Sequence, residues 1–203
     1  MKEKFVNSSI NFISKYQECD DLKIKKLKYG LEGIFNLITK LIIILLISIL
    51  TQTITETALL ILFYAGIRTF SFGWHAKSSF GCWISSLLVY IIIPIFLKYP
   101  LPNYFGFIIL GVALISMIIW APADTPKRPL IRKKQRLKAK IISIIIVCLY
   151  SSLYLITNIV IIKNAILYAL LIQTILINPI TYKITNTRFN NYKYYKKEKL
   201  TMV

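Results

Sequence analysis

The hydrophobic positions of the chain gather into long stretches, which short polar or basic segments separate. A membrane-spanning helix needs about 20 mainly apolar residues, and most of these stretches approach that length. We predict an all-α fold, a polytopic membrane bundle of about six hydrophobic segments: residues 34–50, 57–67, 83–97, 104–120, 141–158 and 165–180.

The second stretch needs an extension to cross a bilayer. Its uncharged core, 57–67, is only 11 residues long. Because a long arginine side chain can reach the lipid headgroups from inside a helix, we predict that this helix continues through Arg68 to Phe72. Its cytoplasmic end then lies near Arg68.

Basic residues lie between the stretches and predict the side that each connection occupies. Residues 121–140 hold eight basic residues against one acid, Asp124. Cytoplasmic connections are rich in Lys and Arg, so this loop, both termini and the segment around His75 are predicted to be cytoplasmic. Residues 182–203 form a basic cytoplasmic tail in this scheme. The three other connections hold few lysines, so the six crossings agree with one another.

The N-terminal region, residues 1–30, has no uninterrupted apolar core and is not predicted to be a cleavable signal peptide. Residues 2–16 follow an imperfect helical period with a basic side. Two interpretations fit this amphipathic region: a helix lying in the membrane interface, and a solvated arm. No internal repeat divides the chain, and we predict a single integral membrane domain over residues 1–203.

Composition supports the membrane class. Hydrophobic residues make up 56% of the chain, charged residues make up 17%, and the mean hydropathy is +0.62, whereas ordinary soluble domains hold about 45–50% apolar residues. The net charge of +18 is segregated from the apolar stretches. Its expected partner is therefore the lipid bilayer with its anionic headgroups, and not nucleic acid.

The chemistry of the chain centres on His75 and Cys82. His75 is the only histidine, and it precedes Cys82 by seven residues in a polar break between two apolar stretches. A thiol becomes a useful nucleophile when a base takes its proton and a nearby positive charge, here Lys77, favours the thiolate. This is the chemistry of a cysteine peptidase, with Cys82 as nucleophile and His75 as general base. From spacing alone, such a pair is structural more often than catalytic.

Other chemistry is less well supported. A serine nucleophile would also need His75, and a thiol is the better nucleophile at neutral pH; the nearby hydroxyls are those of Ser78, Ser79, Ser85 and Ser86. One histidine and eight scattered acids provide no metal-binding cluster, so no metal or other cofactor is expected. Of the other cysteines, Cys19 lies among acids and Cys148 is predicted to be a buried small side chain.

Geometry adds a constraint on the pair. Residues seven apart on a continuous helix lie about 10.5 Å apart along its axis, so the helix must break between His75 and Cys82. A helix beginning near Phe80 would direct its positive N-terminal end at the thiol, with Ser78, Ser79 and Gly81 as breakers or caps. Two acids from other segments, Glu32 and Asp124, are candidates to orient His75.

The same residues carry a family resemblance. The chain resembles the accessory gene regulator protein B family, membrane peptidases that process quorum-sensing peptide precursors. The matching residues are the motif APADTPKRP at 121–129 and Arg68, Gly73, His75, Ala76, Ser78, Ser79 and Cys82. The order of apolar segments extends the resemblance over nearly the whole chain, and His75 and Cys82 fall on the catalytic pair of that family.

The resemblance implies a reaction at the inner face of a bacterial cytoplasmic membrane. Cys82 would cleave a small precursor peptide and hold its N-terminal part as a thioester, which a cysteine of the peptide captures as a thiolactone. It also suggests a homodimer. The substrate-binding residues predicted for this reaction are Arg68, Ser78, Ser79, Lys127 and Arg128. From its position alone, Arg68 fits a membrane-interface anchor equally well, and Lys127 and Arg128 fit topology determinants.

A non-enzymatic membrane transporter or export channel for a peptide is the alternative function. His75 would then gate or relay protons, and the basic loops would bind an anionic cargo. The sequence contains no inverted repeat or nucleotide-binding motif that would favour this alternative.

Overall fold

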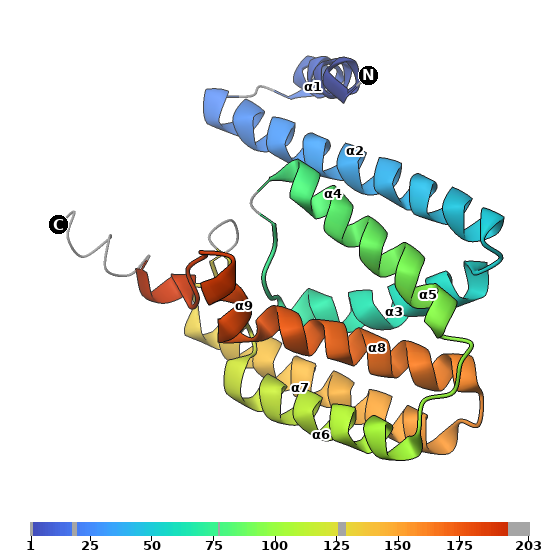
Figure 1. Cartoon of the computed structure of the whole chain (residues 1–203). Helices are drawn as coiled ribbons and strands as arrows, with labels where there is room; N and C mark the ends of the chain where they lie inside the picture. The colour runs from blue at the N-terminus through green and yellow to red at the C-terminus, as the bar shows by residue number, and fades with distance from the viewer. Residues whose placement is uncertain (1, 18–19, 77, 126–128, 195–203) are drawn as a thin grey trace. The chain divides into compact units, whose positions relative to one another are not determined.

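The computed structural model describes residues 2–17, 20–76, 78–125 and 129–194, apart from the side chain of Ser79. These residues are mainly helical, and the predicted all-α membrane bundle is confirmed (Figure 1). The helices are α1 Lys2–Tyr16, α2 Asp21–Leu50, α3 Ile54–Ser71, α4 Ser79–Leu87, the π-helical turn η1 Leu88–Ile92, α5 Ile93–Phe96, α6 Asn103–Trp120, α7 Lys133–Ile156, α8 Val160–Ile177 and α9 Pro179–Ile184. Contacts divide the chain into two compact units, Met1–Thr51 and Gln52–Val203.

Each of the six predicted stretches forms helix. Within the described residues, four helices are long and apolar enough to cross a membrane: α2, α6, α7 and α8. The run from α4 to α5 contains a shorter apolar helix, Phe80–Phe96. α3 ends at Ser71, close to the predicted end.

Several helix boundaries differ from the prediction, and three of them have a clear physical reason. α2 begins at Asp21 and α7 at Lys133, well before the apolar stretches they contain. Lys, Arg and Glu are good helix formers, so both helices extend into their basic flanks. α8 ends at Ile177 because Asn178 is extended before Pro179, and a residue that precedes proline disfavours the helical conformation.

The first unit consists of α1 packed on α2. Val6 of α1 is buried, the rings of Phe5 and Phe35 lie 5.6 Å apart, and Lys2 Nζ lies 3.4 Å from Glu32 Oε2. Only 11% of the most apolar part of α2 is buried by protein. An apolar helix that protein covers so little is suited to face lipid. The amphipathic helix α1 exists, while its position in the membrane interface stays a prediction.

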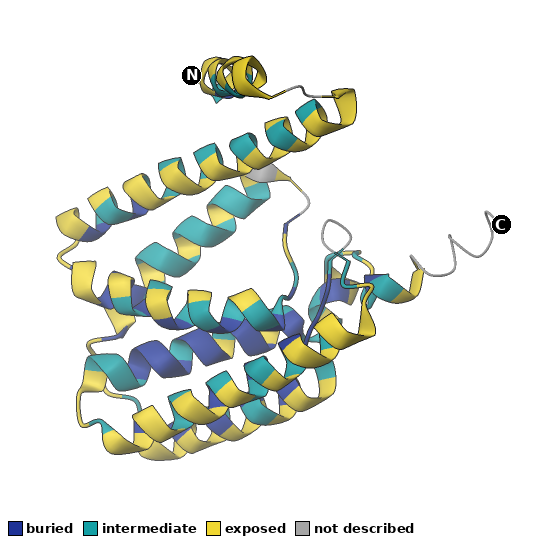
Figure 2. Ribbon diagram, turned by 180° about the vertical axis from the view of Figure 1, so that it is seen from behind, coloured by how far each residue is buried: buried dark blue, intermediate teal, exposed yellow. Residues whose placement is uncertain are grey.

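The second unit is organised around α8. Figure 2 shows the buried residues concentrated along this helix, which lies among α3, α6 and α7. Its buried side chains are Asn164, Ala165, Ile166, Leu167, Ala169, Leu170, Gln173, Thr174 and Ile177. Two of them are amides, which need hydrogen-bond partners in an apolar interior.

These two amides mark opposite ends of the second unit. Asn164 Nδ2 donates to the carbonyl oxygens of Leu97 and Tyr99, at 2.8 and 2.7 Å. Gln173 Nε2 donates to Ser71 Oγ and Phe72 O, both at 2.6 Å. One end therefore holds the connection from α5 to α6, and the other holds the segment that follows α3.

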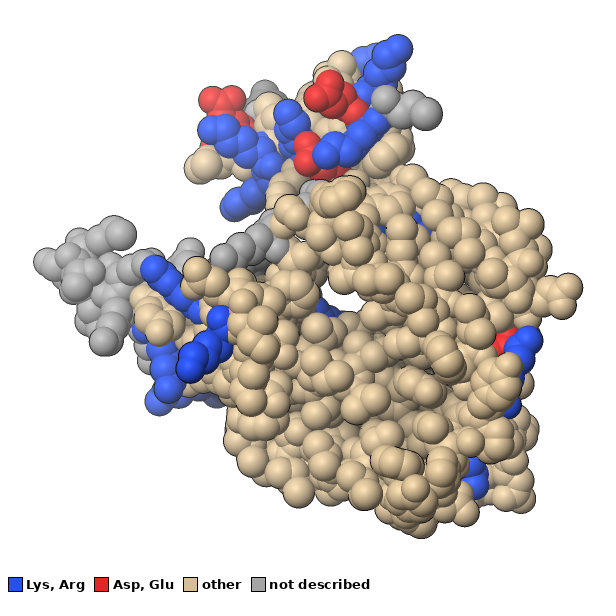
Figure 3. Space-filling view, viewed as in Figure 1, with Lys and Arg blue, Asp and Glu red and all other residues tan. Residues whose placement is uncertain are grey.

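Charge in the second unit is distributed in the same way. Figure 3 shows Lys and Arg gathered beside α9, a few charged residues towards the opposite end, and an almost uncharged face between them. Lys98 at that opposite end donates to Gln52 O at 3.1 Å and lies 3.8 Å from Glu56 Oε1. This distribution is typical of a membrane protein, while the side of the membrane on which each end lies stays a prediction.

Candidate active site

The helix breaks between His75 and Cys82. α3 ends at Ser71, and the segment 72–78, here called the His75 segment, leads to α4. Ser78 is the N-cap of α4, and its hydroxyl accepts a hydrogen bond from the Gly81 N–H at 3.0 Å. Such a cap satisfies one of the free donors of the first turn. Cys82 consequently lies in the first turn of α4, where the positive end of the helix dipole favours a thiolate.

This break brings the two predicted catalytic side chains together. Cys82 Sγ lies 3.6 Å from His75 Nε2, and His75 Nδ1 lies 3.0 Å from the carbonyl oxygen of Ala76. A carbonyl oxygen only accepts hydrogen bonds, so Nδ1 carries a hydrogen and Nε2 faces the thiol. Within the second unit, a main-chain carbonyl therefore orients His75, and Asp124 does not.

The electrostatics of the pair favour a charged imidazolium. The hydrogen bond with Cys82 raises the pKa of His75 above its ordinary value, and partial burial of the ring opposes this rise. The carbonyl of Ala76 and the charge of Cys82 act in the same direction as the hydrogen bond. Because proton affinities of interacting groups are coupled, the same contact favours the thiolate form of Cys82. The side chains are accessible, with His75 exposed and Cys82 half-buried.

The side chain of Arg68 holds the His75 segment through hydrogen bonds to main-chain carbonyl oxygens of that segment. Its guanidinium donates to Phe72 O at 2.9 Å and to Trp74 O at 2.5 Å. Gly73, between them, has φ of +116°, and a Cβ there would lie 2.6 Å from Arg68 Nη1. Only glycine suits this backbone conformation and this close approach. The contacts give Arg68 a positioning role that the sequence did not suggest, and its predicted contact with substrate stays a prediction.

Two distant segments also hold the His75 segment. The Gly73 N–H donates to Ala123 O at 2.8 Å, and the Trp74 N–H donates to Leu176 O at 2.8 Å. Phe72 and Ala123 form a parallel bridge, to which Gln173 adds the bonds described above. Sequence reasoning missed these anchors. The available signal was the pair of amides within the mainly apolar α8.

The remaining site predictions have mixed outcomes. Ser78 caps α4, and the hydroxyls of Ser85 and Ser86 donate to the Cys82 carbonyl at 3.2 and 2.8 Å. Residues 19, 77, 127 and 128 and the side chain of Ser79 lie outside what the structure describes. The predicted contacts of Lys77, Ser79, Lys127 and Arg128 therefore stay predictions.

The prediction for Cys148 is wrong. Its side chain is exposed on α7, whereas its neighbour Val147 is fully buried. Successive helical residues point about 100° apart, so Val147 faces the bundle and Cys148 faces outward.

The two predicted acids have partners of their own. Glu32 pairs with Lys2 in the first unit. Asp124 is fully buried, and its Oδ1 lies 3.6 Å from Arg136 Nη1. Among the described residues, no group of three His, Cys, Asp or Glu side chains is placed to hold a metal ion.

A basic cavity lies beside the 121–125 loop. It has a volume of about 430 Å³, and its walls come from the end of α6, the start of α7 and the C-terminal segment. Three cations line it, Lys133, Arg136 and Lys140, together with the aromatic residues Trp120, Phe189 and Tyr192. The loop that holds the His75 segment therefore also borders a site suited to an anionic group.

Comparison with known proteins gives one consistent result. The family model described as accessory gene regulator B matches residues 6–177. A protein of Listeria monocytogenes described as a putative AgrB-like protein is 33% identical over 172 residues, 84% of each chain. A putative AgrB-like protein of Clostridium acetobutylicum is 34% identical over 184 residues, 89% of this chain and 87% of its own.

The accessory gene regulator protein B of Staphylococcus carnosus is 32% identical over 141 residues, 68% of this chain and 74% of its own. No solved structure matches the chain. His75, Cys82, Arg68 and Ala123 all lie within the residues that the family model matches.

Proposed function

The chain belongs to the accessory gene regulator B family, and from this premise we propose that it is a membrane cysteine endopeptidase that cleaves a small precursor peptide. Membership supports a role in processing a quorum-sensing signal. The peptidase chemistry is our proposal from the geometry of the site.

The contact between Cys82 Sγ and His75 Nε2, at 3.6 Å, is the observation that carries the proposal. The Ala76 carbonyl fixes the ring so that Nε2 faces the sulfur, which is the arrangement of a nucleophile beside an oriented base. The raised pKa of His75 favours an imidazolium, which can give its proton to a leaving amine.

In the proposed reaction, the sulfur of Cys82 attacks the scissile carbonyl and the peptide C–N bond breaks. His75 protonates the leaving amine, so the C-terminal part of the precursor departs with a neutral N-terminus. The N-terminal part remains as a thioester on Cys82. A cysteine thiol within that part then gives its proton to the now neutral His75 and attacks the thioester, which closes a thiolactone ring and regenerates the Cys82 thiolate. Holding the two groups in one complex gives this step a large effective concentration.

The proposed substrate contacts combine charge and polar groups. Lys127 and Arg128 would meet an acidic part of the precursor, with Arg68, Ser78 and Ser79 nearer the scissile bond. The cavity cations Lys133, Arg136 and Lys140 add positive charge beside the same loop. Because opposite charges attract over about 8 Å at physiological ionic strength, this region would help to capture an acidic peptide.

The proposed location is the inner face of the bacterial cytoplasmic membrane, with both termini and the active site on the cytoplasmic side. The bilayer is then the main partner besides the peptide, and a homodimer remains part of the proposal. A site at the membrane surface limits access of water, which favours capture of the thioester by the internal thiol over hydrolysis.

Trapping the acyl-enzyme tests the proposal. The precursor's internal cysteine is replaced by Ala, which removes the intramolecular thiol and leaves only slow hydrolysis. We expect a covalent adduct on the full-length protein by mass spectrometry, mapped to Cys82 and released by hydroxylamine. Cys82→Ala should form none, and His75→Ala should form it slowly or not at all.

Two matched controls complete this experiment. Cys19→Ala and Cys148→Ala each remove a thiol while leaving the pair intact, and both should form the adduct as the parent does. An adduct that survives Cys82→Ala or maps to another cysteine contradicts the proposed nucleophile. If Cys82→Ser cleaves normally but export of the peptide fails, the chain acts as a transporter instead.

A further inference from the structure

The main chain of Ala123 and Asp124 joins the His75 segment to the C-terminal segment. On one side, Ala123 O accepts from the Gly73 N–H at 2.8 Å, and the Ala123 N–H donates to Ser71 O at 3.0 Å. The same Ala123 O also accepts from the Tyr182 hydroxyl at 3.1 Å. Ala123 is fully buried, so these bonds are shielded from water. They fix the position of the His75 segment relative to α8.

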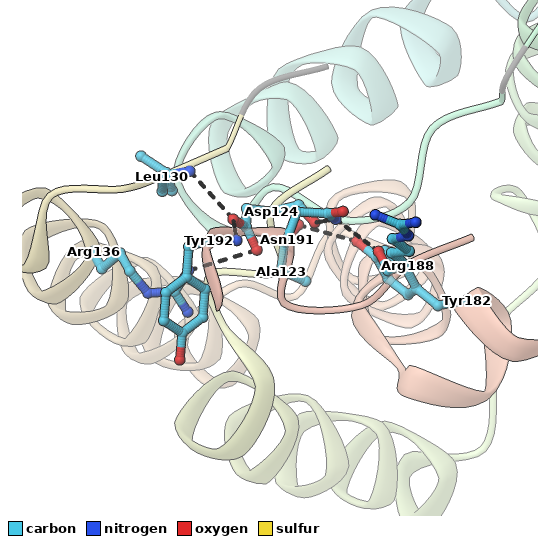
Figure 4. Close-up of polar contacts among 8 residues, drawn as sticks. All are labelled: Ala123, Asp124, Leu130, Arg136, Tyr182, Arg188, Asn191 and Tyr192. Carbon is cyan, nitrogen blue, oxygen red and sulfur yellow. Dashed lines mark hydrogen bonds and ion pairs between the residues drawn. The ribbon is translucent and has the colours of Figure 1, made fainter. Parts of the chain in front are cut away.

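Asp124 makes the connection on the other side (Figure 4). Its Oδ2 accepts from the Tyr192 N–H at 2.9 Å and from the Leu130 N–H at 3.2 Å. Its carbonyl oxygen accepts from Asn191 Nδ2 at 3.1 Å, and that amide also donates to Arg188 O at 2.7 Å. Residues far apart in sequence therefore converge on a single carboxylate and its own main chain.

A cation lies beside Asp124 in this buried position. Its Oδ1 faces Arg136 Nη1 at 3.6 Å, and the Arg136 guanidinium lies over the Tyr192 ring at 3.6 Å from the ring centre. A buried ion pair adds little net stability compared with apolar residues of the same shape, because desolvation offsets the attraction. Its better-attested use is to specify one arrangement of the chain, which fits a positioning role here.

The C-terminal side of this network lies beyond the residues that match the family. The match ends at residue 177, whereas Tyr182, Asn191 and Tyr192 all follow it. Asn191 is 5% exposed and Tyr182 is 1% exposed. Buried polar groups with these specific partners indicate an ordered part of the site and not a solvated tail.

We propose that Ala123 and Asp124 form a latch by which the C-terminal segment positions His75 against Cys82. Asp124, Tyr182 and Asn191 are positioning residues in this scheme, because they act on the reaction only through the His75 segment. The inference rests on the proposed function for its kinetic readout. Its effect on the position of His75 is measurable without that function.

Four full-length variants test the latch. Asp124→Asn removes the charge that faces Arg136 and adds an amide N–H donor beside the N–H groups of Leu130 and Tyr192, which are themselves donors. Asn191→Ala removes the bonds to Asp124 O and Arg188 O, and Tyr182→Phe removes only the hydroxyl on Ala123 O. Tyr150→Phe is the matched control, since its hydroxyl also donates to a main-chain carbonyl, that of Phe63 at 3.0 Å, and this bond is not part of the latch.

Two measurements are made on each purified variant in nanodiscs. The first is precursor cleavage, separated into kcat and KM. The second is the titration of His75 by NMR, which reports a single residue because the chain has one histidine. Misplacement of catalytic groups by about 1 Å costs up to about 100-fold in rate. We expect kcat to fall about 10- to 100-fold in Asp124→Asn and Asn191→Ala, with KM nearly unchanged, and less in Tyr182→Phe.

The His75 titration separates positioning from stability. In the latch variants the Cys82 contact loosens, so the pKa of His75 should move down towards its ordinary value, whereas Tyr150→Phe should leave it in place. If the latch variants match Tyr150→Phe in both kcat and titration, the inference is overturned. If Asp124→Asn and Asn191→Ala fail to fold, Tyr182→Phe decides: equality with Tyr150→Phe means that the network is only structural.

Failure of the proposed function has a different signature. The unmodified protein would then cleave no precursor, while the titration of His75 would still move in the latch variants. That result contradicts the peptidase proposal and supports the latch. If the unmodified protein cleaves the precursor and the pKa of His75 is unchanged in the latch variants, the latch is contradicted and the peptidase proposal stands.

Discussion

Among the described residues, His75 contacts the side chain of Cys82 and the carbonyl oxygen of Ala76, and the proposed chemistry depends on these two contacts. The sequence predicted the pair, the helix break and a serine cap, because all three depend on residues close together in the chain. It did not predict what orients the ring, since a main-chain carbonyl leaves no mark in the residue types. The two acids considered for that role are occupied by Lys2 and Arg136.

The first residue-scale prediction concerns the titration of His75. Cys82→Ala removes the hydrogen bond that is the largest cause of the raised pKa, together with the charge of Cys82. Burial and the charge of Arg68 then act to lower the value. Histidine-labelled protein followed by NMR from pH 5 to 9, a range chosen around the ordinary value of about 6.5, should give a lower pKa in Cys82→Ala than in the unmodified protein.

The sign for stability follows from the same shift. A raised pKa in the folded state means that the charged imidazolium stabilises the fold. This contribution is fully present below about 6.5 and is lost as the pH rises through the raised value. The stability advantage of the unmodified protein over Cys82→Ala should therefore shrink as the pH increases. Equal titrations in the two proteins would show that the contact at 3.6 Å has no electrostatic effect.

The second residue-scale prediction concerns Gly73. Gly73→Ala places a Cβ 2.6 Å from Arg68 Nη1 in a backbone conformation with φ of +116°, which costs about 1–3 kcal/mol. Displacement of Arg68 would release Phe72 and Trp74, so cleavage should fall at least about tenfold. Gly111→Ala is the control, since nothing lies within 4 Å of the added carbon. Normal cleavage by Gly73→Ala would show that this close approach is unimportant for the reaction.

At the scale of elements, α8 connects the site to the rest of the bundle. The apolar stretches predicted the helices because hydrophobicity and length are properties of each segment alone. The anchors of the His75 segment were not predictable in the same way, since Gln173 and Phe72 are 101 residues apart. Such a contact depends on how α3 and α8 pack. A polar residue in an apolar helix indicates that it needs a hydrogen-bond partner, but it does not indicate which residue that partner is.

Replacing each amide of α8 by Leu should show that the two ends of the helix affect cleavage differently. Gln173→Leu removes the donors to Ser71 Oγ and Phe72 O, so it should lower cleavage at least about tenfold. Its stability cost should be modest, about 0.6–1.7 kcal/mol for a hydrogen bond between helices in a membrane. Asn164→Leu removes comparable bonds at the opposite end and should cost similar stability with little loss of cleavage.

Cleavage assays and thermal unfolding in the same detergent distinguish these two effects. Equal losses of cleavage in the two variants would mean that α8 acts on the reaction only through the stability of the bundle.

At the scale of the whole molecule, the structure groups the connections at two ends of the second unit. The loop at 121–125 and the end of α8 meet the His75 segment. Lys98 and Asn164 belong to the opposite end. The basic residues of the first group and the positive-inside rule predict that this group is cytoplasmic.

Labelling of single cysteines in intact cells tests this topology. In a chain lacking its own cysteines, Lys98→Cys should react with a reagent that does not cross the membrane. Lys77→Cys and Lys134→Cys should react only after the cells are opened. Equal labelling at positions 77 and 98 from outside would remove the third crossing and place the site on the outer face.

The main-chain acceptor for His75 has a consequence for inheritance. In a triad with an acidic third member, a single codon change deletes the orienting group. The Ala76 carbonyl is present whichever amino acid occupies position 76, so no missense change removes it. Under the proposed function, selection against loss of signalling therefore acts on His75, Cys82 and the residues that shape the chain around them. Natural inactive alleles of this gene should accumulate at those positions and not at a third catalytic side chain.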